Sequence, residues 1–209
     1  MVLNKPPGLP VQGGKGIKIS LDSILSEKIH PRPLLVHRLD RDTSGIILVA
    51  KTKESAQGFS VLFSGDGAQK KDRNVIKQYL AVCSGVPVPK EGVIALDLEL
   101  RGKQKKSETL YKLQSSRIIK EFSVSLLELE LRTGRMHQIR RHLALKGNPV
   151  LGDDKYGDFS LNKALRKTFA LKQLLLHASK LCIPSLPPFL PLALEITAPL
   201  PEYFSNFIT

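Results

Sequence analysis

One stretch of the chain alternates strictly between apolar and acidic side chains, and this pattern restricts the fold more than any other. In residues 122–134, which read FSVSLLELELRTG, the leucines from Leu127 to Leu131 alternate with Glu128 and Glu130. Successive side chains of a strand point to opposite faces of a sheet, so the segment predicts a strand with one buried and one solvated face. Because parallel sheets are normally covered on both faces, the pattern favours antiparallel pairing.

Most of the other apolar segments also have strand patterns, and a few helical patterns lie between them. Ser20 and Thr52 are suited to cap helices, and helical spacing recurs in residues 135–146 and 161–172. No internal repeat and no regular alternation of strands with helices is present, which predicts an α+β fold. The remaining expected strands are residues 46–50, 77–85, 92–102, 174–183 and 192–197.

The charge balance indicates a polyanionic partner. The chain carries 32 Lys and Arg against 19 Asp and Glu, a net charge of +13. Basic side chains gain affinity for nucleic acid by releasing counterions from phosphates, so nucleic acid is the first expectation. The alternative is a basic enzyme whose charge only aids solubility. With 42% hydrophobic residues in 209, the chain predicts one globular domain, or one domain with two lobes.

Several features bear on the compartment of the protein. Cys83 and Cys182 form no CxxC pair, which is typical of a reduced, intracellular chain. No apolar run approaches the ~20 residues that span a bilayer, and the first residues lack a secretory signal pattern. The expected location is the cytoplasm, with no membrane partner.

The helix expected over residues 135–146 places an arginine beside its apolar stripe. Met136, Ile139 and Leu143 form that stripe at helical spacing, and Arg140 lies four residues from Met136. Arg140 is therefore predicted to enter a partly buried place. The alternative is that its aliphatic stem covers the edge of the stripe while the guanidinium reaches water.

A buried guanidinium needs a carboxylate partner, because an unpaired one costs several kcal/mol. The candidate is Asp40 in HRLDRDTSG, which precedes the apolar strand 46–50. On local grounds alone, an aspartate at this place is more often a turn residue that hydrogen-bonds its own backbone. Gln138 and Arg141 are predicted to point away from the stripe.

Five segments of the chain form a longer pattern: NKPPGLPVQGG (4–14), HRLDRDTSGIILVAKT (37–52), KQYLAV (77–82), TGRMHQIRRHLALKGNPVLGDDKYG (133–157) and LLLHASKL (174–181). Taken together and in this order, they resemble the RluA-type pseudouridine synthases. The closest likeness is to the members that modify large-subunit ribosomal RNA. The resemblance implies a pseudouridine-synthase fold with a curved mixed sheet and a central active-site cleft, and it implies no metal and no cofactor.

The resemblance also implies a role for each matching residue. Asp40 is the expected nucleophile that breaks the bond between ribose and uracil, by attack on either the sugar or the base. Tyr79 is expected to stack on the base and to help remove the proton from carbon 5. Arg140 is expected to pair with Asp40, and Arg38 to contact RNA where the target nucleotide leaves its stack. A uridine inside RNA structure must be flipped out to be reached, which explains the need for such contacts.

The other expected substrate-binding residues lie around these four. His37 is expected to support the loop of Asp40 by hydrogen bonds, and Leu176 to lie near the base. Arg141 is expected to contact a phosphate, with a solvated charge as the alternative. No metal is expected, because His137 and His142 are five residues apart and no HExxH pattern is present. The full expected set is His37, Arg38, Arg135, His137, Gln138, Arg141 and Leu176.

The resemblance leaves the RNA target open. Ribosomal RNA is the first expectation and transfer RNA the second, while a non-catalytic RNA-binding relative is the alternative to an enzyme. Residues 1–209 are expected to form a single catalytic domain without the separate N-terminal RNA-binding domain of many members. A monomer is expected, since no amphipathic surface is left unassigned.

Overall fold

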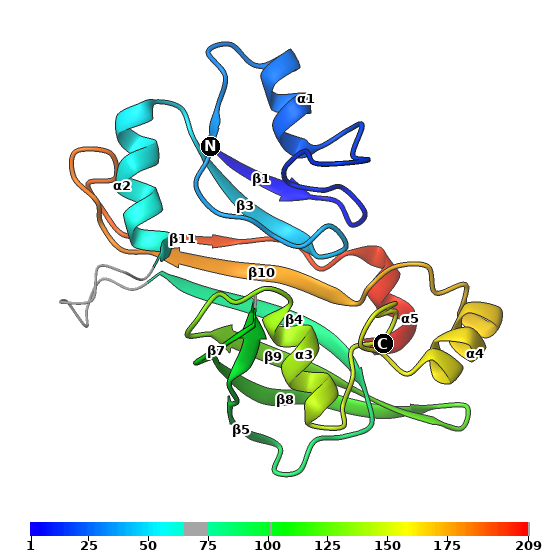
Figure 1. The fold of residues 1–209 in the computed structure, drawn as a ribbon. Coiled ribbons are helices and arrows are strands. Elements are labelled where there is room, and N and C mark those ends of the chain that lie inside the picture. Colours follow the sequence, from blue (N-terminus) through cyan, green and yellow to red (C-terminus); the bar gives the residue numbers. More distant parts are fainter. Residues whose placement is uncertain (65–74, 101, 209) are drawn as a thin grey trace. The chain divides into compact units, whose positions relative to one another are not determined.

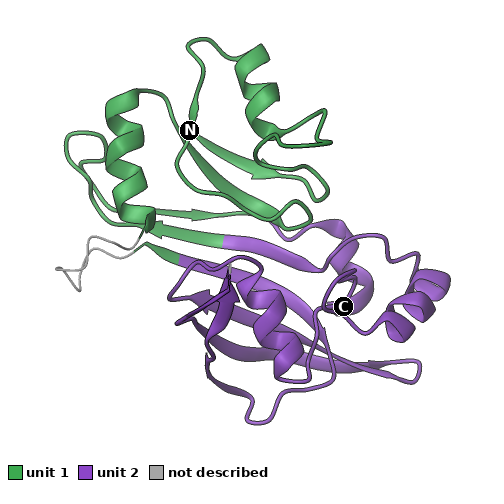
Figure 2. Cartoon of the chain, viewed as in Figure 1, with its two compact units in different colours: residues 1–76, 180–198 green, residues 77–179, 199–209 purple. Residues whose placement is uncertain are grey.

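The computed structural model describes residues 1–64, 75–100 and 102–208. The chain divides into two compact units (Figure 2). Unit 1 comprises Met1–Ile76 and Lys180–Ala198, and unit 2 comprises Lys77–Ser179 and Pro199–Thr209. Each unit therefore contains a segment from the later part of the chain.

Unit 1 is built around strand β3, Ser44–Ala50, in which every residue is buried. This confirms the strand predicted over residues 46–50. Strand β1 (Val2–Lys5) pairs antiparallel with β3 (Figure 1). Strand β2 (Leu34–Leu35) also pairs antiparallel with β3. Strand β10 (Leu176–Ile183) begins in unit 2 and ends in unit 1, where it pairs antiparallel with β11 (Leu194–Thr197).

Both helices of unit 1 begin where the sequence predicts. Helix α1 (Leu21–Lys28) follows Ser20, which forms a capping box with Ser23. Helix α2 (Lys53–Ser64) follows Thr52, whose Oγ1 accepts a hydrogen bond from the backbone three residues later. Such caps satisfy N–H groups that have no partner within the helix. The apolar side of α2 packs on the core of unit 1 through Ala56, Phe59, Leu62 and Phe63.

Unit 2 contains an antiparallel sheet with the strand order β4-β9-β8-β5. Its strands are β4 (Ile76–Ser84), β5 (Glu91–Ala95), β8 (Glu108–Ile119) and β9 (Phe122–Leu131). Strand β9 carries the alternating leucines and lies between two antiparallel neighbours. The pairing predicted from the alternation is confirmed.

The prediction of a single strand over residues 92–102 is wrong, because the chain forms two separate strands there. Strand β5 ends at Ala95, and β6 (Leu98–Leu100) pairs with β7 (Lys103–Lys105) in a separate hairpin. The backbone leaves the sheet at Leu96, whose carbonyl accepts a hydrogen bond from the hydroxyl of Ser107. That tertiary contact does not appear in the local hydrophobic pattern.

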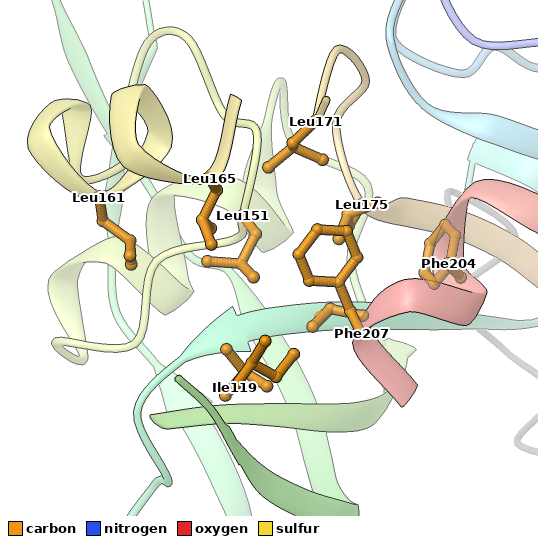
Figure 3. Packing of buried hydrophobic residues seen from close by; sticks show 10 residues of the cluster. Ile119, Leu151, Leu161, Leu165, Leu171, Leu175, Phe204 and Phe207 are labelled. Carbon is orange, nitrogen blue, oxygen red and sulfur yellow. The ribbon is translucent and has the colours of Figure 1, made fainter. Parts of the chain in front are cut away.

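The helices of unit 2 are α3 (Gln138–Leu145), α4 (Phe159–Phe169) and α5 (Ser205–Ile208), with a 3₁₀ turn at Glu202–Phe204. A second hydrophobic cluster lies in this unit, with α4 and the C-terminal segment against the sheet (Figure 3). The cluster joins side chains from the sheet, from α4 and from the C-terminal segment. Its buried members are Val82, Ile119, Val124, Leu151, Leu161, Leu165, Leu171, Leu175, Phe204 and Phe207.

Helix α3 begins later than the sequence predicts. The expected start was Arg135, but His137 has a left-handed backbone (φ 53°) and the helix begins at Gln138. The side-chain oxygen of Gln138 accepts the N–H of Arg135, which closes a turn ahead of the helix. Met136 lies in this turn and is 51% exposed, so its predicted place on the apolar stripe is wrong.

The α+β class and the mostly antiparallel sheet are confirmed, since the two units combine helices with antiparallel strand pairs. The curvature of the sheet and the central cleft stay predictions. Across residues 1–64, 75–100 and 102–208, every helix is too short or too polar to cross a bilayer.

Candidate active site

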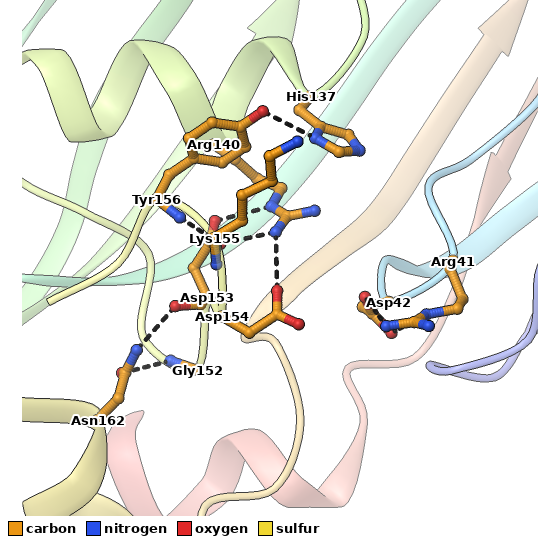
Figure 4. A network of polar contacts seen from close by, with 10 residues as sticks. All are labelled: Arg41, Asp42, His137, Arg140, Gly152, Asp153, Asp154, Lys155, Tyr156 and Asn162. Carbon is orange, nitrogen blue, oxygen red and sulfur yellow. Dashed lines mark hydrogen bonds and ion pairs between the residues drawn. The ribbon is translucent and has the colours of Figure 1, made fainter. Parts of the chain in front are cut away.

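In unit 1, Asp40 lies in the loop between β2 and β3. Its side chain is half-buried, and Arg38 two residues earlier is exposed. The next two residues form an ion pair, with Arg41 Nε 3.0 Å from Asp42 Oδ1 (Figure 4). The candidate nucleophile is thus flanked by charged side chains that reach water.

Lys5 anchors this loop from β1. Its Nζ lies 2.8 Å from the carbonyl oxygen of Arg41, although the residue is only 1% exposed. The same ammonium donates to the carbonyls of Pro6 (2.8 Å) and Leu9 (2.9 Å). Burial lowers the pKa of Lys5 to about 8, although two acidic side chains of the loop oppose the shift. The buried cation therefore joins the first turn of the chain to the loop of the candidate nucleophile.

His37 supports the same loop, as the sequence predicts. Its Nε2 accepts a hydrogen bond from the N–H of Leu48 in β3, at 2.8 Å. Its ring stacks on Phe63 of α2 with centroids 4.2 Å apart and planes 7° apart. Because Nε2 is the acceptor, a neutral His37 carries its proton on Nδ1.

In unit 2, Arg140 points inward from α3. Ile139 and Leu143 beside it are buried, and the Arg140 side chain is only 4% exposed. The prediction of a buried arginine is confirmed. Its guanidinium forms a two-point ion pair with Asp153, with Nε 2.7 Å from Oδ2 and Nη2 2.6 Å from Oδ1 (Figure 4). Asp154 adds a longer contact, 3.3 Å from Nη2.

Asp153 is held ionised by its surroundings. Burial raises the pKa of the carboxyl. The hydrogen bonds from Arg140 and from the backbone N–H groups of Tyr156 and Lys155 lower this pKa by a larger amount. The net effect places the pKa of Asp153 below its ordinary value of 3.8. Both backbone N–H groups lie 2.9 Å from Oδ1. Hydrogen bonds to the charged form of a carboxyl group lower its pKa, in agreement with this direction.

An aromatic ring completes the surroundings of Arg140. The ring centroid of Tyr156 lies 5.3 Å from Arg140 Cζ, within the range of a cation–π contact. The hydroxyl of Tyr156 lies 3.1 Å from His137 Nδ1, at the start of α3. The half-buried His137 therefore contacts a residue that covers Arg140.

The turn that carries Asp153 is fixed from α4. Asn162 accepts the N–H of Gly152 at 2.8 Å and donates to the carbonyl of Asp153 at 2.9 Å. A Cβ on Gly157 would lie 2.3 Å from that same carbonyl oxygen, and one on Gly152 would lie 2.0 Å from the carbonyl oxygen of Gln173. Glycine is therefore required at both positions.

Gln138 is buried rather than turned to solvent, so its predicted orientation is wrong. Its amide nitrogen donates to Glu108 O and to Thr109 Oγ1, both at 2.9 Å. Its amide oxygen accepts from Thr133 Oγ1 at 2.7 Å. Thr109 also lies 3.0 Å from Nδ1 of the buried His142. This network fixes the start of α3 against β8.

Arg135 and Arg141 lie near the β6–β7 hairpin. Arg135 Nε donates to the carbonyl of Lys106 at 3.2 Å, and Arg141 Nη1 donates to that of Glu99 at 3.0 Å. In each contact one nitrogen of the guanidinium donates to an exposed backbone carbonyl in or next to this hairpin. As predicted, Arg141 points away from the apolar stripe.

Tyr79 and Leu176 are both buried in unit 2. Tyr79 lies on β4 opposite Leu129 of β9, and Leu176 is the first residue of β10. Their expected places beside a uracil base stay predictions.

The candidate residues fall into two groups. Unit 1 contains Asp40, Arg38 and His37, whereas unit 2 contains the others. The pairing of Asp40 with Arg140 would join residues of different units and stays a prediction. Within the described ranges, no group of three or more His, Cys, Asp or Glu side chains is arranged to hold a metal ion.

Three residues that the sequence reasoning missed are central to these contacts: Lys5, Asp153 and Asn162. A signal existed for Asp153, because a buried arginine needs a carboxylate and GDDKYGD follows α3 closely. No comparable signal existed for Asn162, whose role depends on how α4 packs.

Comparison with known proteins assigns the class of this molecule. A family model described as RNA pseudouridylate synthase matches residues 1–145 of the 209. The chain belongs to this family. The enzyme class predicted from the sequence, an RNA pseudouridine synthase, is therefore confirmed.

Individual relatives agree with this assignment. The chain is 31% identical to ribosomal large subunit pseudouridine synthase C of Buchnera aphidicola, over 100% of this chain and 67% of the relative. It is 35% identical to the protein of that name from Rickettsia conorii, over 100% of this chain and 68% of the relative. The chain thus spans about two thirds of the length of these relatives.

The fold also has a match among solved structures. Human RNA pseudouridylate synthase domain containing 4 is 28% identical, with a TM-score of 0.77 over 98% of this chain and 87% of that one. The pseudouridine-synthase fold expected from the resemblance is confirmed.

Proposed function

We propose that this chain converts specific uridines of large-subunit ribosomal RNA into pseudouridine. The observation that carries the proposal is similarity along the whole chain to synthases whose names specify the large ribosomal subunit. The net charge of +13 supplies affinity for a phosphate backbone. Transfer RNA is the second candidate substrate, and a non-catalytic RNA-binding relative is the alternative.

In this proposal the reaction begins with the carboxylate of Asp40. An oxygen of Asp40 attacks either the sugar or the base, the bond between ribose and N1 breaks, and the negative charge passes to the uracil. The freed uracil rotates and bonds to the ribose through carbon 5, and the bond between Asp40 and the nucleoside breaks, which regenerates the carboxylate. Carbon 5 then loses its proton and N1 gains one, so substrate and product have the same composition. An ionised carboxyl is required, because only the charged form is an effective nucleophile.

Arg140 and Tyr79 assist this nucleophile in the proposal. A guanidinium near Asp40 favours its charged form and lowers its pKa. Tyr79 stacks on the extruded base and helps remove the carbon 5 proton. Both side chains are buried in unit 2, which suits a reaction from which water is excluded.

The remaining contacts hold the RNA. Arg38 is exposed beside Asp40 and fits the gap left by the flipped nucleotide. Leu176 borders the base, and Arg135 and Arg141 approach phosphates beside the β6–β7 hairpin. We propose that Gln138 and His137 act through protein contacts, since Gln138 fixes the start of α3 and His137 meets Tyr156.

We further propose that the two compact units act as one catalytic domain, as a monomer, in the cytoplasm. Support for one catalytic domain comes from the distribution of the expected residues over both units. The named relatives come from bacteria, in which ribosomal RNA is made in the cytoplasm, and this supports the proposed location.

Mapping pseudouridines in total RNA from cells with and without the gene tests the target. We expect one or more large-subunit sites to disappear without the gene and to return with the wild-type gene. If a gene that encodes Asp40→Asn also restored these sites, the assignment of Asp40 as the nucleophile would be contradicted. Loss of sites in transfer RNA alone would replace the ribosomal target, and no lost site in any RNA would favour the non-catalytic alternative.

A further inference from the structure

We propose that Asp153 is a positioning residue that fixes the guanidinium of Arg140 for the reaction. This inference rests on the proposed function, in which Arg140 acts on Asp40. It adds a second carboxylate whose task is separate from that of the nucleophile.

The geometry determines which side of the guanidinium remains for other partners. Asp153 occupies the edge formed by Nε and Nη2, at 2.7 and 2.6 Å. Tyr156 covers the guanidinium with its ring, 5.3 Å from Cζ. Asp154 adds a contact 3.3 Å from the same Nη2. A further carboxylate that approaches in the guanidinium plane is therefore expected on the Nη1 side. Two-point pairs of this kind define orientation as well as charge.

The charge of Asp153 also matters after Asp40 has formed its covalent bond and has lost its negative charge. Once Asp40 forms its covalent bond, its oxygen no longer carries the negative charge. Asp154 lies 3.3 Å from Nη2 but is 59% exposed, so without Asp153 the buried guanidinium would then be poorly compensated. Asp153 remains ionised and paired throughout, so formation of the covalent intermediate does not leave Arg140 alone.

The turn around Asp153 is built to keep this position. Its carbonyl accepts from Asn162 at 2.9 Å, and its Oδ1 accepts two backbone N–H groups at 2.9 Å. Gly152 and Gly157 leave no room for a Cβ. A carboxylate that only neutralised Arg140 would not need this rigid support. We therefore assign Asn162 as a second positioning residue that acts through Asp153.

The test compares Asp153→Asn with wild type and with Asp158→Asn. Asp158 caps α4 through Leu161 N at 2.9 Å, and asparagine caps helices equally well, so this control carries the same chemical change near the same turn. For folded Asp153→Asn we expect kcat for pseudouridine formation to fall at least tenfold, with KM for the RNA within about twofold.

The pH profile separates positioning from a structural role. Removing the charge of Asp153 takes away a negative charge that opposes ionisation of the nucleophile, so the pKa of Asp40 falls. The acidic limb of kcat is then expected to move to lower pH. Loss of folded protein alone would reduce the amplitude and leave this limb in place. Wild-type kcat with an unmoved limb would overturn the proposal.

A second variant decides the matter if Asp153→Asn is recovered only unfolded. Asn162→Ala keeps both charges and loosens the turn, so kcat should fall severalfold with KM unchanged. Wild-type kcat in that variant would overturn the inference. Inactivity of the wild-type protein would instead contradict the proposed function, so the two failures are distinguishable.

Discussion

The ammonium group of Lys5 lies 2.8 Å from the carbonyl oxygen of Arg41, the residue that follows the proposed nucleophile. A fully enclosed lysine with three carbonyl acceptors is rare, because an ammonium loses much hydration on burial. Here the three bonds join the NKPPGLP turn to the loop of Asp40. The loop of the proposed nucleophile is thus anchored by a residue 35 positions earlier in the chain than Asp40.

Replacing this cation should disturb both stability and activity. Lys5→Met leaves three buried carbonyl oxygens without their donor, which we expect to reduce the free energy of unfolding by about 3 kcal/mol. Activity per folded molecule should also fall, because the loop of Asp40 loses its anchor. Denaturant unfolding and pseudouridine formation measure the two effects. Lys18→Met, at an exposed lysine of the same unit, is the control and should match wild type.

The charge of Arg140 is expected to set the acidic limit of the reaction. Arg140→Met alone strands the buried carboxylate of Asp153 and should destabilise the protein by about 3–5 kcal/mol. Arg140→Met/Asp153→Asn leaves no buried unpaired charge. In this double variant we expect a higher pKa for Asp40, and hence an acidic limb at higher pH and a slower reaction. A pH–rate profile that coincides with wild type would count against the pairing of Asp40 with Arg140.

Arg141 should contribute to RNA affinity through charge. Its Nη1 donates to Glu99 O, so its guanidinium lies beside the β6–β7 hairpin, which exposes Lys103 and Lys105. We expect Arg141→Ala to weaken RNA binding and to make the slope of log K against log salt shallower by about 1. Arg117→Ala, at an exposed position near the other end of β8, is the control. An unchanged slope would mean that Arg141 only braces the hairpin.

His142 should make stability depend on mildly acidic pH. Burial is the main cause that lowers the pKa of His142 below 6.5, opposed by a hydrogen bond to Leu96 and aided by Arg141. The unfolded chain therefore binds the proton more readily. Stability should be complete above pH 6.5 and should decline below it, by at most about 1.4 kcal/mol per pH unit.

Thermal unfolding between pH 5 and pH 7 measures this dependence. His142→Gln should flatten it, even if it lowers stability at neutral pH. His30→Gln, at an exposed histidine, should keep the wild-type slope. The idea fails if His142→Gln retains the same slope as wild type.

Local patterns predicted much of the fold. The alternation around Leu127 placed β9 inside an antiparallel sheet, and the caps at Ser20 and Thr52 located two helices. These features depend on neighbours in sequence, which is why they are visible there. The late start of α3 was not, because it depends on the tertiary bonds of Gln138 to β8.

The site shows the same division. Helical spacing predicted that Arg140 is buried, since periodicity determines which face a residue occupies. It did not predict Asp153 as the partner that the structure shows, because the carboxylate is brought there by a glycine turn clamped from α4. The anchoring role of Lys5 was also missed, since buried lysines with carbonyl partners leave no sequence pattern.

The most direct measurement of the central claim is pseudouridine formation by Asp40→Asn. The variant should be folded and should bind RNA with wild-type affinity, because the substitution is isosteric and Asp40 is only half-buried. Nucleosides from digested RNA, separated after incubation with wild type or variant, give the yield directly. We predict pseudouridine with wild type and none with Asp40→Asn. Equal yields from the two proteins would contradict the claim that Asp40 is the nucleophile.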